Sequence, residues 1–131
     1  MTQSTGRLEE NKALAVAFYD LAFNQKRPAE AAARYLAPDY RQHNQEAGDG
    51  AQGFVAFVTG FTQRFPQLYL DVKRVLADGD FVVLHVHART TPEDRGAVVM
   101  DIFRLQGGRI VEHWDAIQPI AAELPHSNGM F

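Results

Sequence analysis

The sequence predicts one small α+β domain, in which three N-terminal helices pack inside a curved antiparallel sheet shaped like a cone. Apolar residues recur every three or four positions in the first half of the chain, which is typical of helices. After Pro66 the period changes to two, and helices followed by a run of strands indicate the α+β class. The 131 residues, 46% of them hydrophobic, are enough for one core. We therefore expect a single domain over 1–131, with irregular tails at 1–7 and 120–131.

Two helices are expected before residue 38. Apolar residues share one face from Leu8 to Leu21, and Asn24 interrupts the pattern, so the first helix should end near residue 23. Pro28 suits the first turn of a second helix, because its missing N–H costs nothing there. That helix should stop before Pro38.

A third helix is expected after a polar stretch and a glycine-containing loop. The stretch from Asp39 to Asn44 indicates a brief strand or an extended loop. Phe54 then opens an amphipathic pattern that continues to about Arg64, and Pro66 ends it.

Four long strands should complete the domain. Asp78-Gly79-Asp80 and Gly107-Gly108 are strong turn signals between alternating segments. The expected strands cover 68–76, 81–89, 96–106 and 109–118.

The most informative residue is Asp101, a lone carboxylate on an otherwise apolar strand face. A buried carboxylate must find a donor or hold a proton. If the strands on either side of 90–95 pair, His87 could lie near Asp101, and the two could exchange protons at neutral pH. Asp101 could equally be a structural acid bonded to a tyrosine or histidine. Val99 and Phe103 share its face and are expected to bind the same ligand.

Other polar residues allow more than one interpretation. His85 and His87 form an H-x-H pair that could bind a metal with Asp101 as the third ligand, but no H-E-x-x-H or comparable spacing supports this, so we expect no metal site. His43 could be a hydrogen-bonding group at the edge of a pocket or part of a solvated loop. Trp114 is expected in the core or as a pocket wall. His113 and Asp115 could form a structural bond or belong to the pocket if a bulge changes the register.

Composition narrows the classes of function. The net charge of −3 includes no dominant basic patch, which argues against nucleic acid as a partner. Without cysteine the chain has no disulfide, and without an apolar leader or a long apolar run we expect a cytoplasmic protein with no membrane partner. No G-x-S-x-G motif, glycine-rich phosphate loop or alternating βαβ pattern occurs.

Four segments carry a resemblance to a known family: 40–44, 100–105, 107–111 and 112–115. With them, the chain from about Leu8 to Gln118 resembles the SnoaL-like (polyketide cyclase-like) branch of the NTF2-like superfamily. The resemblance implies an NTF2-like or cystatin-like cone around a pocket. It also implies a homodimer formed through the outer face of the sheet, for which Val82, Leu84 and Val86 are the expected aliphatic residues.

The resemblance also implies roles for individual residues. In SnoaL-type cyclases an aspartate on the third long strand is the acid–base group of an aldol condensation, and Asp101 occupies that place. His87 and Asn44 look equivalent to residues that line the pocket. Tyr19 falls near the tyrosine that completes the oxyanion hole of ketosteroid isomerase. The base aspartate of that isomerase is absent here, because the corresponding segment reads His43-Asn44.

We therefore expect a cofactor-independent enzyme that acts on a small hydrophobic carbonyl compound by aldol condensation or isomerase-like proton transfer. Asp101, His87 and His43 would be catalytic. The substrate-binding residues would be Asn44, His85, Tyr19, Trp114, Phe103 and Val99. Two alternatives stay open: a binding or interaction domain without catalysis, and a hydrolase or dehydratase, where a hydrolase would need a second carboxylate beside Asp101. The tail that ends in Phe131 could cover the pocket mouth or be frayed.

Overall fold

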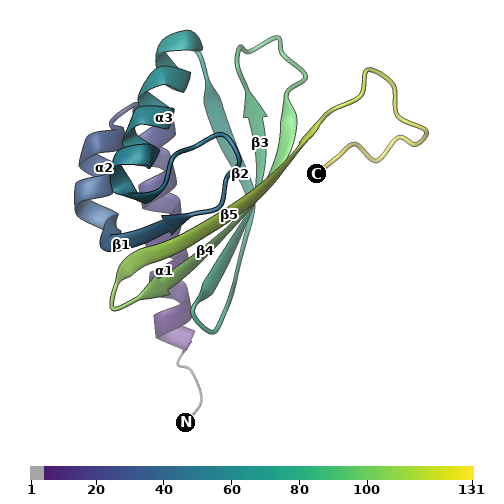
Figure 1. The fold of residues 1–131 in the computed structure, drawn as a ribbon. Helices are drawn as coiled ribbons and strands as arrows, with labels where there is room; N and C mark the ends of the chain where they lie inside the picture. Colours follow the sequence, from purple (N-terminus) through teal and green to yellow (C-terminus); the bar gives the residue numbers. More distant parts are fainter. Residues whose placement is uncertain (1–4) are drawn as a thin grey trace.

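The computed structural model describes residues 5–131, which form helices on one side of a curved sheet (Figure 1). The helical elements are α1 (Thr5–Tyr19), the π-helix η1 (Asp20–Asn24), α2 (Pro28–Tyr35) and α3 (Gly50–Arg64). The strands are β1 (Leu36–Gln42), β2 (Tyr69–Asp78), β3 (Phe81–Arg89), β4 (Ala97–Gln106) and β5 (Arg109–Pro119). The predicted α+β class is confirmed.

The sheet has the strand order β1-β5-β4-β3-β2. Strands β2 to β5 form an antiparallel meander, as predicted, whereas β1 pairs with β5 in parallel. The expectation of an antiparallel sheet is therefore corrected to a mixed sheet. The parallel pairing matters for the site, because it places the end of β1 beside His113 of β5.

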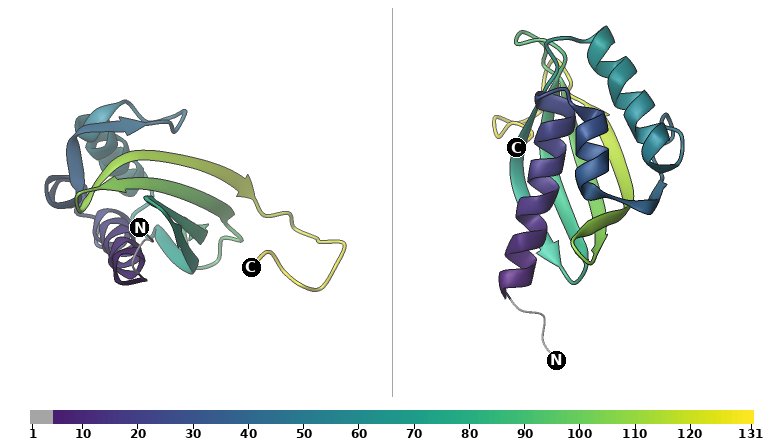
Figure 2. Two further views of the ribbon diagram at one scale, coloured as in Figure 1. Left: turned by 90° about the horizontal axis from the view of Figure 1, so that it is seen from below. Right: turned by 90° about the vertical axis from the view of Figure 1, so that its left-hand side faces the viewer.

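The helices cover the inner face of the sheet, and the core lies between these two layers (Figure 2). Val82, Leu84 and Val86 are fully buried on this inner face, opposite Phe103, Asp101 and Val99 of β4. The prediction that these three aliphatic residues form the outer face is therefore wrong. The exposed apolar residues on the outer face of β3 and β4 are instead Phe81, Met100 and Ile102.

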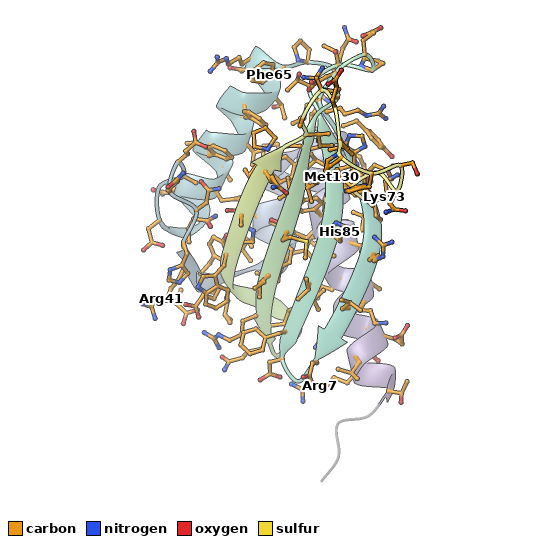
Figure 3. The ribbon with its side chains drawn as sticks, turned by 90° about the vertical axis from the view of Figure 1, so that its right-hand side faces the viewer. Arg7, Arg41, Phe65, Lys73, His85 and Met130 are labelled. Atoms are coloured by element: carbon orange, nitrogen blue, oxygen red, sulfur yellow. The ribbon has the colours of Figure 1, made fainter. Side chains whose placement is uncertain are left out.

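Both ends of the described chain differ from expectation. Helix α1 already begins at Thr5, inside the segment expected to be an irregular tail, and residues 1–4 lie outside the described residues. Residues 120–131 form neither helix nor strand and return to the outer face of the sheet, where Met130 lies near His85 and Lys73 (Figure 3). The Phe131 ring packs 4.7 Å from the His87 ring, so the tail does not cover the pocket.

No helix within residues 5–131 has the length and apolar character needed to cross a membrane.

Candidate active site

A cavity of about 630 Å³ lies between the helices and the inner face of the sheet. Most of its wall is aromatic or aliphatic, and it includes Phe18, Phe23, Phe54, Phe57, Phe61, Leu68, Leu70, Val99, Phe103 and Ile117. The exposed residues Glu46 and Arg64 also line it, so the cavity reaches the surface. An apolar cavity with a few convergent polar groups is the usual form of a small-molecule site.

Asp101 on β4 is held by donors on both of its carboxylate oxygens. The Tyr19 hydroxyl at the end of α1 lies 2.6 Å from Oδ2, and His113 Nε2 on β5 lies 2.8 Å from Oδ1. Asp101 is only 2% exposed. Burial, followed by the charge of Asp101, raises the pKa of Tyr19, so its hydroxyl keeps its proton and donates to Asp101.

The Gln42 side chain fixes the tautomer of His113. Gln42 Oε1 accepts the backbone N–H groups of His43 and Asn44, so this end of the amide must be the oxygen. His113 Nδ1 lies 2.8 Å from the same oxygen and therefore carries a proton. The bond between His113 Nε2 and Asp101 then holds one further proton, shared between an imidazole and a carboxylate.

Asp115 is the second carboxylate of the site and has a single donor side chain. It is the strand partner of Asp101, and its Oδ2 lies 4.0 Å from His113 Nε2. Asn44 Nδ2 donates to both Asp115 oxygens, at 2.9 and 3.0 Å. Asn44 Oδ1 accepts the backbone N–H of Glu46, which keeps the amide nitrogen turned towards Asp115.

The environment makes Asp115 a stronger base than an ordinary aspartate. Burial raises its pKa, and the nearby Asp101 raises it further, whereas His113 and the hydrogen bond from Asn44 act in the opposite direction. A carboxylate can accept about four hydrogen bonds, so Asp115 retains acceptor sites in the cavity that it lines. The arrangement can therefore take a proton from a bound molecule.

Several predicted site residues do meet in this cavity. Tyr19, Asn44, Val99, Asp101 and Phe103 all line it. His113 and Asp115, whose position the sequence left open, line it as well.

The predicted roles of His87 and His85 do not agree with their positions. His87 Nε2 bonds the carbonyl oxygen of Arg95, and its ring packs against Phe131 on the outer face. His85 bonds Arg74 through Nδ1. The expectation that His87 lies beside Asp101 is wrong, because Leu84 is the strand partner of Asp101 and alternation sends both histidines outward.

His43 and Trp114 also lie outside the cavity lining. Their rings stack with centroids 5.0 Å apart and an interplanar angle of 2°. His43 Nε2 bonds Glu112, which Arg104 also binds, and these contacts lower the pKa of Glu112. The expected catalytic role of His43 and the ligand contact of Trp114 are therefore not supported by their positions.

One group within residues 5–131 has the composition of a metal site. The ligand atoms of Asp101, His113 and Asp115 lie within 4.8 Å of one another. His113 Nε2 already shares a proton with Asp101, so a metal ion would have to displace that proton. The geometry fits a hydrogen-bonded array better than a set of ligands open to a metal.

The residues that sequence reasoning missed are Tyr40 and Gln42 of β1. Both line the cavity with Asn44, at alternate positions, while His43 points away. The alternation was the available signal, since residues i, i+2 and i+4 of an extended segment share a side.

Comparisons with known proteins agree with this fold. A model of the SnoaL-like domain matches residues 15–113. A search of curated proteins found no significant match.

Solved structures of similar fold come from several bacteria. TsrD from Streptomyces laurentii has a TM-score of 0.68 and 19% identity, with 88% of this chain and 91% of that chain covered. A candidate polyketide cyclase from Bacillus cereus has a TM-score of 0.74 and 20% identity, with coverage of 88% and 78%. A candidate ketosteroid isomerase from Kribbella flavida has a TM-score of 0.70 and 25% identity, with coverage of 93% and 87%.

Proposed function

Because this chain belongs to the SnoaL-like domain family, we propose that it is an enzyme that removes and returns a proton next to the carbonyl group of a small hydrophobic compound. Such chemistry serves both an aldol cyclisation and an isomerisation, and similar structures bear both names. It needs one base and one donor to the enolate oxygen, and it needs no cofactor.

The observation that carries the proposal is the state of Asp115. Its carboxylate lines an apolar cavity, its pKa is raised by burial, and it has one donor side chain, Asn44. Asp101 is less suited to direct contact with substrate, because it is only 2% exposed and two side chains, Tyr19 and His113, bind it rather than one. We therefore assign proton abstraction to Asp115.

In this proposal Asp101 and His113 support the base. His113 Nε2, which is bonded to Asp101 Oδ1, lies 4.0 Å from Asp115 Oδ2, so the pair is close enough to respond electrostatically as Asp115 gains and loses a proton. Asn44 orients Asp115 through its two hydrogen bonds.

Deuterium uptake tests this assignment. The probe is 2-acetylnaphthalene, a flat apolar ketone whose methyl hydrogens exchange through an enolate. In D₂O the wild-type protein is expected to speed the gain in mass of the ketone, and Asp115→Asn should remove this effect. Asp39→Asn, which alters an exposed acid on β1, is the matched control. Uptake by Asp115→Asn equal to that of the wild type would refute the role of Asp115.

A hydrolase or dehydratase is the second candidate, and one observation favours it. A water-activating site needs a second carboxylate beside Asp101, and Asp115 is the strand partner of Asp101. This candidate predicts incorporation of ¹⁸O from labelled water into a product, whereas proton transfer at carbon predicts deuterium uptake without ¹⁸O. Ligand binding with neither label would indicate a binding domain.

A further inference from the structure

We propose that the Tyr40 hydroxyl donates the hydrogen bond that holds the carbonyl oxygen of the ligand. This inference rests on the proposed function, because it names the group that stabilises the enolate oxygen. It also defines the ligand as one that presents a hydrogen-bond acceptor to the β1 side of the cavity.

Tyr40 is buried, at 3% exposure, and lines the cavity from β1. Its hydroxyl oxygen accepts a hydrogen bond from Gln42 Nε2 at 2.8 Å. The contacts at the other end of that amide fix its orientation, because Gln42 Oε1 accepts two backbone N–H groups and His113 Nδ1–H. Tyr40 therefore acts as the acceptor towards Gln42, and its own proton is left to donate elsewhere.

No acceptor for the Tyr40 proton lies within hydrogen-bond distance among residues 5–131. The hydroxyl oxygen is bonded to Gln42, but its O–H group is not, and a buried donor usually finds an acceptor on the protein, on a bound molecule or on water. The cavity beside Tyr40 is where such an acceptor can bind.

Tyr19 is the other tyrosine of the site, and its hydroxyl is already used. It donates to Asp101 Oδ2 at 2.6 Å, so a ligand oxygen would have to compete with a carboxylate for this proton. Tyr40 has no such competitor. The expected oxyanion role of Tyr19 therefore passes to Tyr40.

The charge balance of the step is consistent with this role. Asp115 takes the proton from the carbon next to the carbonyl, the electron pair moves onto the carbonyl oxygen, and that oxygen becomes an enolate. The Tyr40 O–H bond stays intact and its hydrogen bond strengthens as the negative charge develops. Burial and the charges of Asp115 and Asp101 raise the pKa of Tyr40, which keeps the hydroxyl protonated.

The test compares two naphthalenes of nearly equal shape. 2-Acetylnaphthalene carries the carbonyl oxygen, and 2-ethylnaphthalene does not. Their dissociation constants are measured by naphthalene fluorescence for the wild type, Tyr40→Phe and Tyr35→Phe. Tyr35 is the control, since its hydroxyl lies outside the cavity lining and makes no hydrogen bond among residues 5–131. Thermal unfolding confirms that each variant folds.

Tyr40→Phe is expected to weaken binding of the ketone about two- to tenfold, which corresponds to one neutral hydrogen bond, and to leave the hydrocarbon unaffected. The rate of deuterium uptake should fall by a larger factor than the affinity does, because the hydrogen bond from Tyr40 strengthens as negative charge develops on the carbonyl oxygen. Equal affinity of the wild type for the two compounds, including no detectable binding of either, would overturn the inference. The inference would also be overturned if Tyr40→Phe weakened the binding of both compounds equally, or of neither.

The two proposals fail in different ways. Tyr40-dependent binding of the ketone without deuterium uptake by the wild type would disprove the proposed reaction and support the role of Tyr40. Deuterium uptake that Asp115→Asn abolishes and Tyr40→Phe leaves unchanged would support the proposed reaction and disprove the role of Tyr40.

Discussion

In the proposed reaction, two aspartates on adjacent strands have different roles because their hydrogen-bond partners differ. Asp101 lines the cavity but is only 2% exposed, and two side chains, Tyr19 and His113, donate to its oxygens. Asp115 receives only the Asn44 amide and keeps free acceptor sites. Burial raises the pKa of Asp115, which makes it a stronger base than an ordinary aspartate.

The pH dependence of deuterium uptake should report the pKa of Asp115. The base acts when deprotonated, so the rate rises with pH through its pKa, which lies above the usual 3.8. The Asn44 hydrogen bond lowers that pKa, so Asn44→Ala should move the acidic limb to higher pH. Rates measured across pH 3–8 check this, and a limb that stays in place or moves to lower pH would contradict the role of Asn44.

At the residue scale, alternation correctly identified Asp101 as an inward-facing acid and Val99 and Phe103 as its neighbours. It failed for His87 because the register between β3 and β4 is set by the connection at residues 90–96. A shift of one residue exchanges the two faces of a strand. The local sequence does not determine that register. In the structure Leu84, rather than a histidine, lies opposite Asp101.

At the scale of elements, the strands β2 to β5 were predictable because glycine-rich turns and alternation mark them locally. The sequence of β1 fits either a strand or an extended loop, because its partner, β5, lies far along the chain. Its parallel pairing is the feature that brings Tyr40, Gln42 and Asn44 to the site.

Helix α3 allows a test of packing with two glycines of one element. A Cβ on Gly53 would lie 2.1 Å from the backbone oxygen of Gly48, whereas a Cβ on Gly60 would meet no atom within 4 Å. Gly53→Ala should therefore lower the free energy of unfolding by about 1–3 kcal/mol. Gly60→Ala should raise it by about 0.5–1 kcal/mol, because alanine favours the helix. Urea denaturation measures both free energies, and equal effects of the two substitutions would contradict close packing at Gly53 and open space at Gly60.

At the scale of the molecule, the outer face of the sheet carries exposed apolar side chains. Phe81, Met100 and Ile102 are between 37% and 42% exposed on adjacent strands. Such a patch is typical of an interface. We expect a homodimer formed through this face, with these residues in place of the buried Val82, Leu84 and Val86 that the sequence suggested.

Sedimentation velocity tests the dimer. The wild type should sediment as a dimer at micromolar concentration, and Ile102→Lys should yield a monomer, because a charge would be buried at the interface. Gln63→Lys, on the exposed side of α3, should leave the dimer intact. A monomeric wild type, or dissociation by both substitutions, would exclude this interface.

The rate of deuterium uptake by 2-acetylnaphthalene tests the central claim most directly, namely that this cavity performs proton transfer through Asp115. At pH 7 the wild type should exceed Asp115→Asn by about 10²–10⁴-fold, the usual contribution of a positioned general base. Equal rates for the wild type, Asp115→Asn and buffer alone, with the ketone bound, would contradict it.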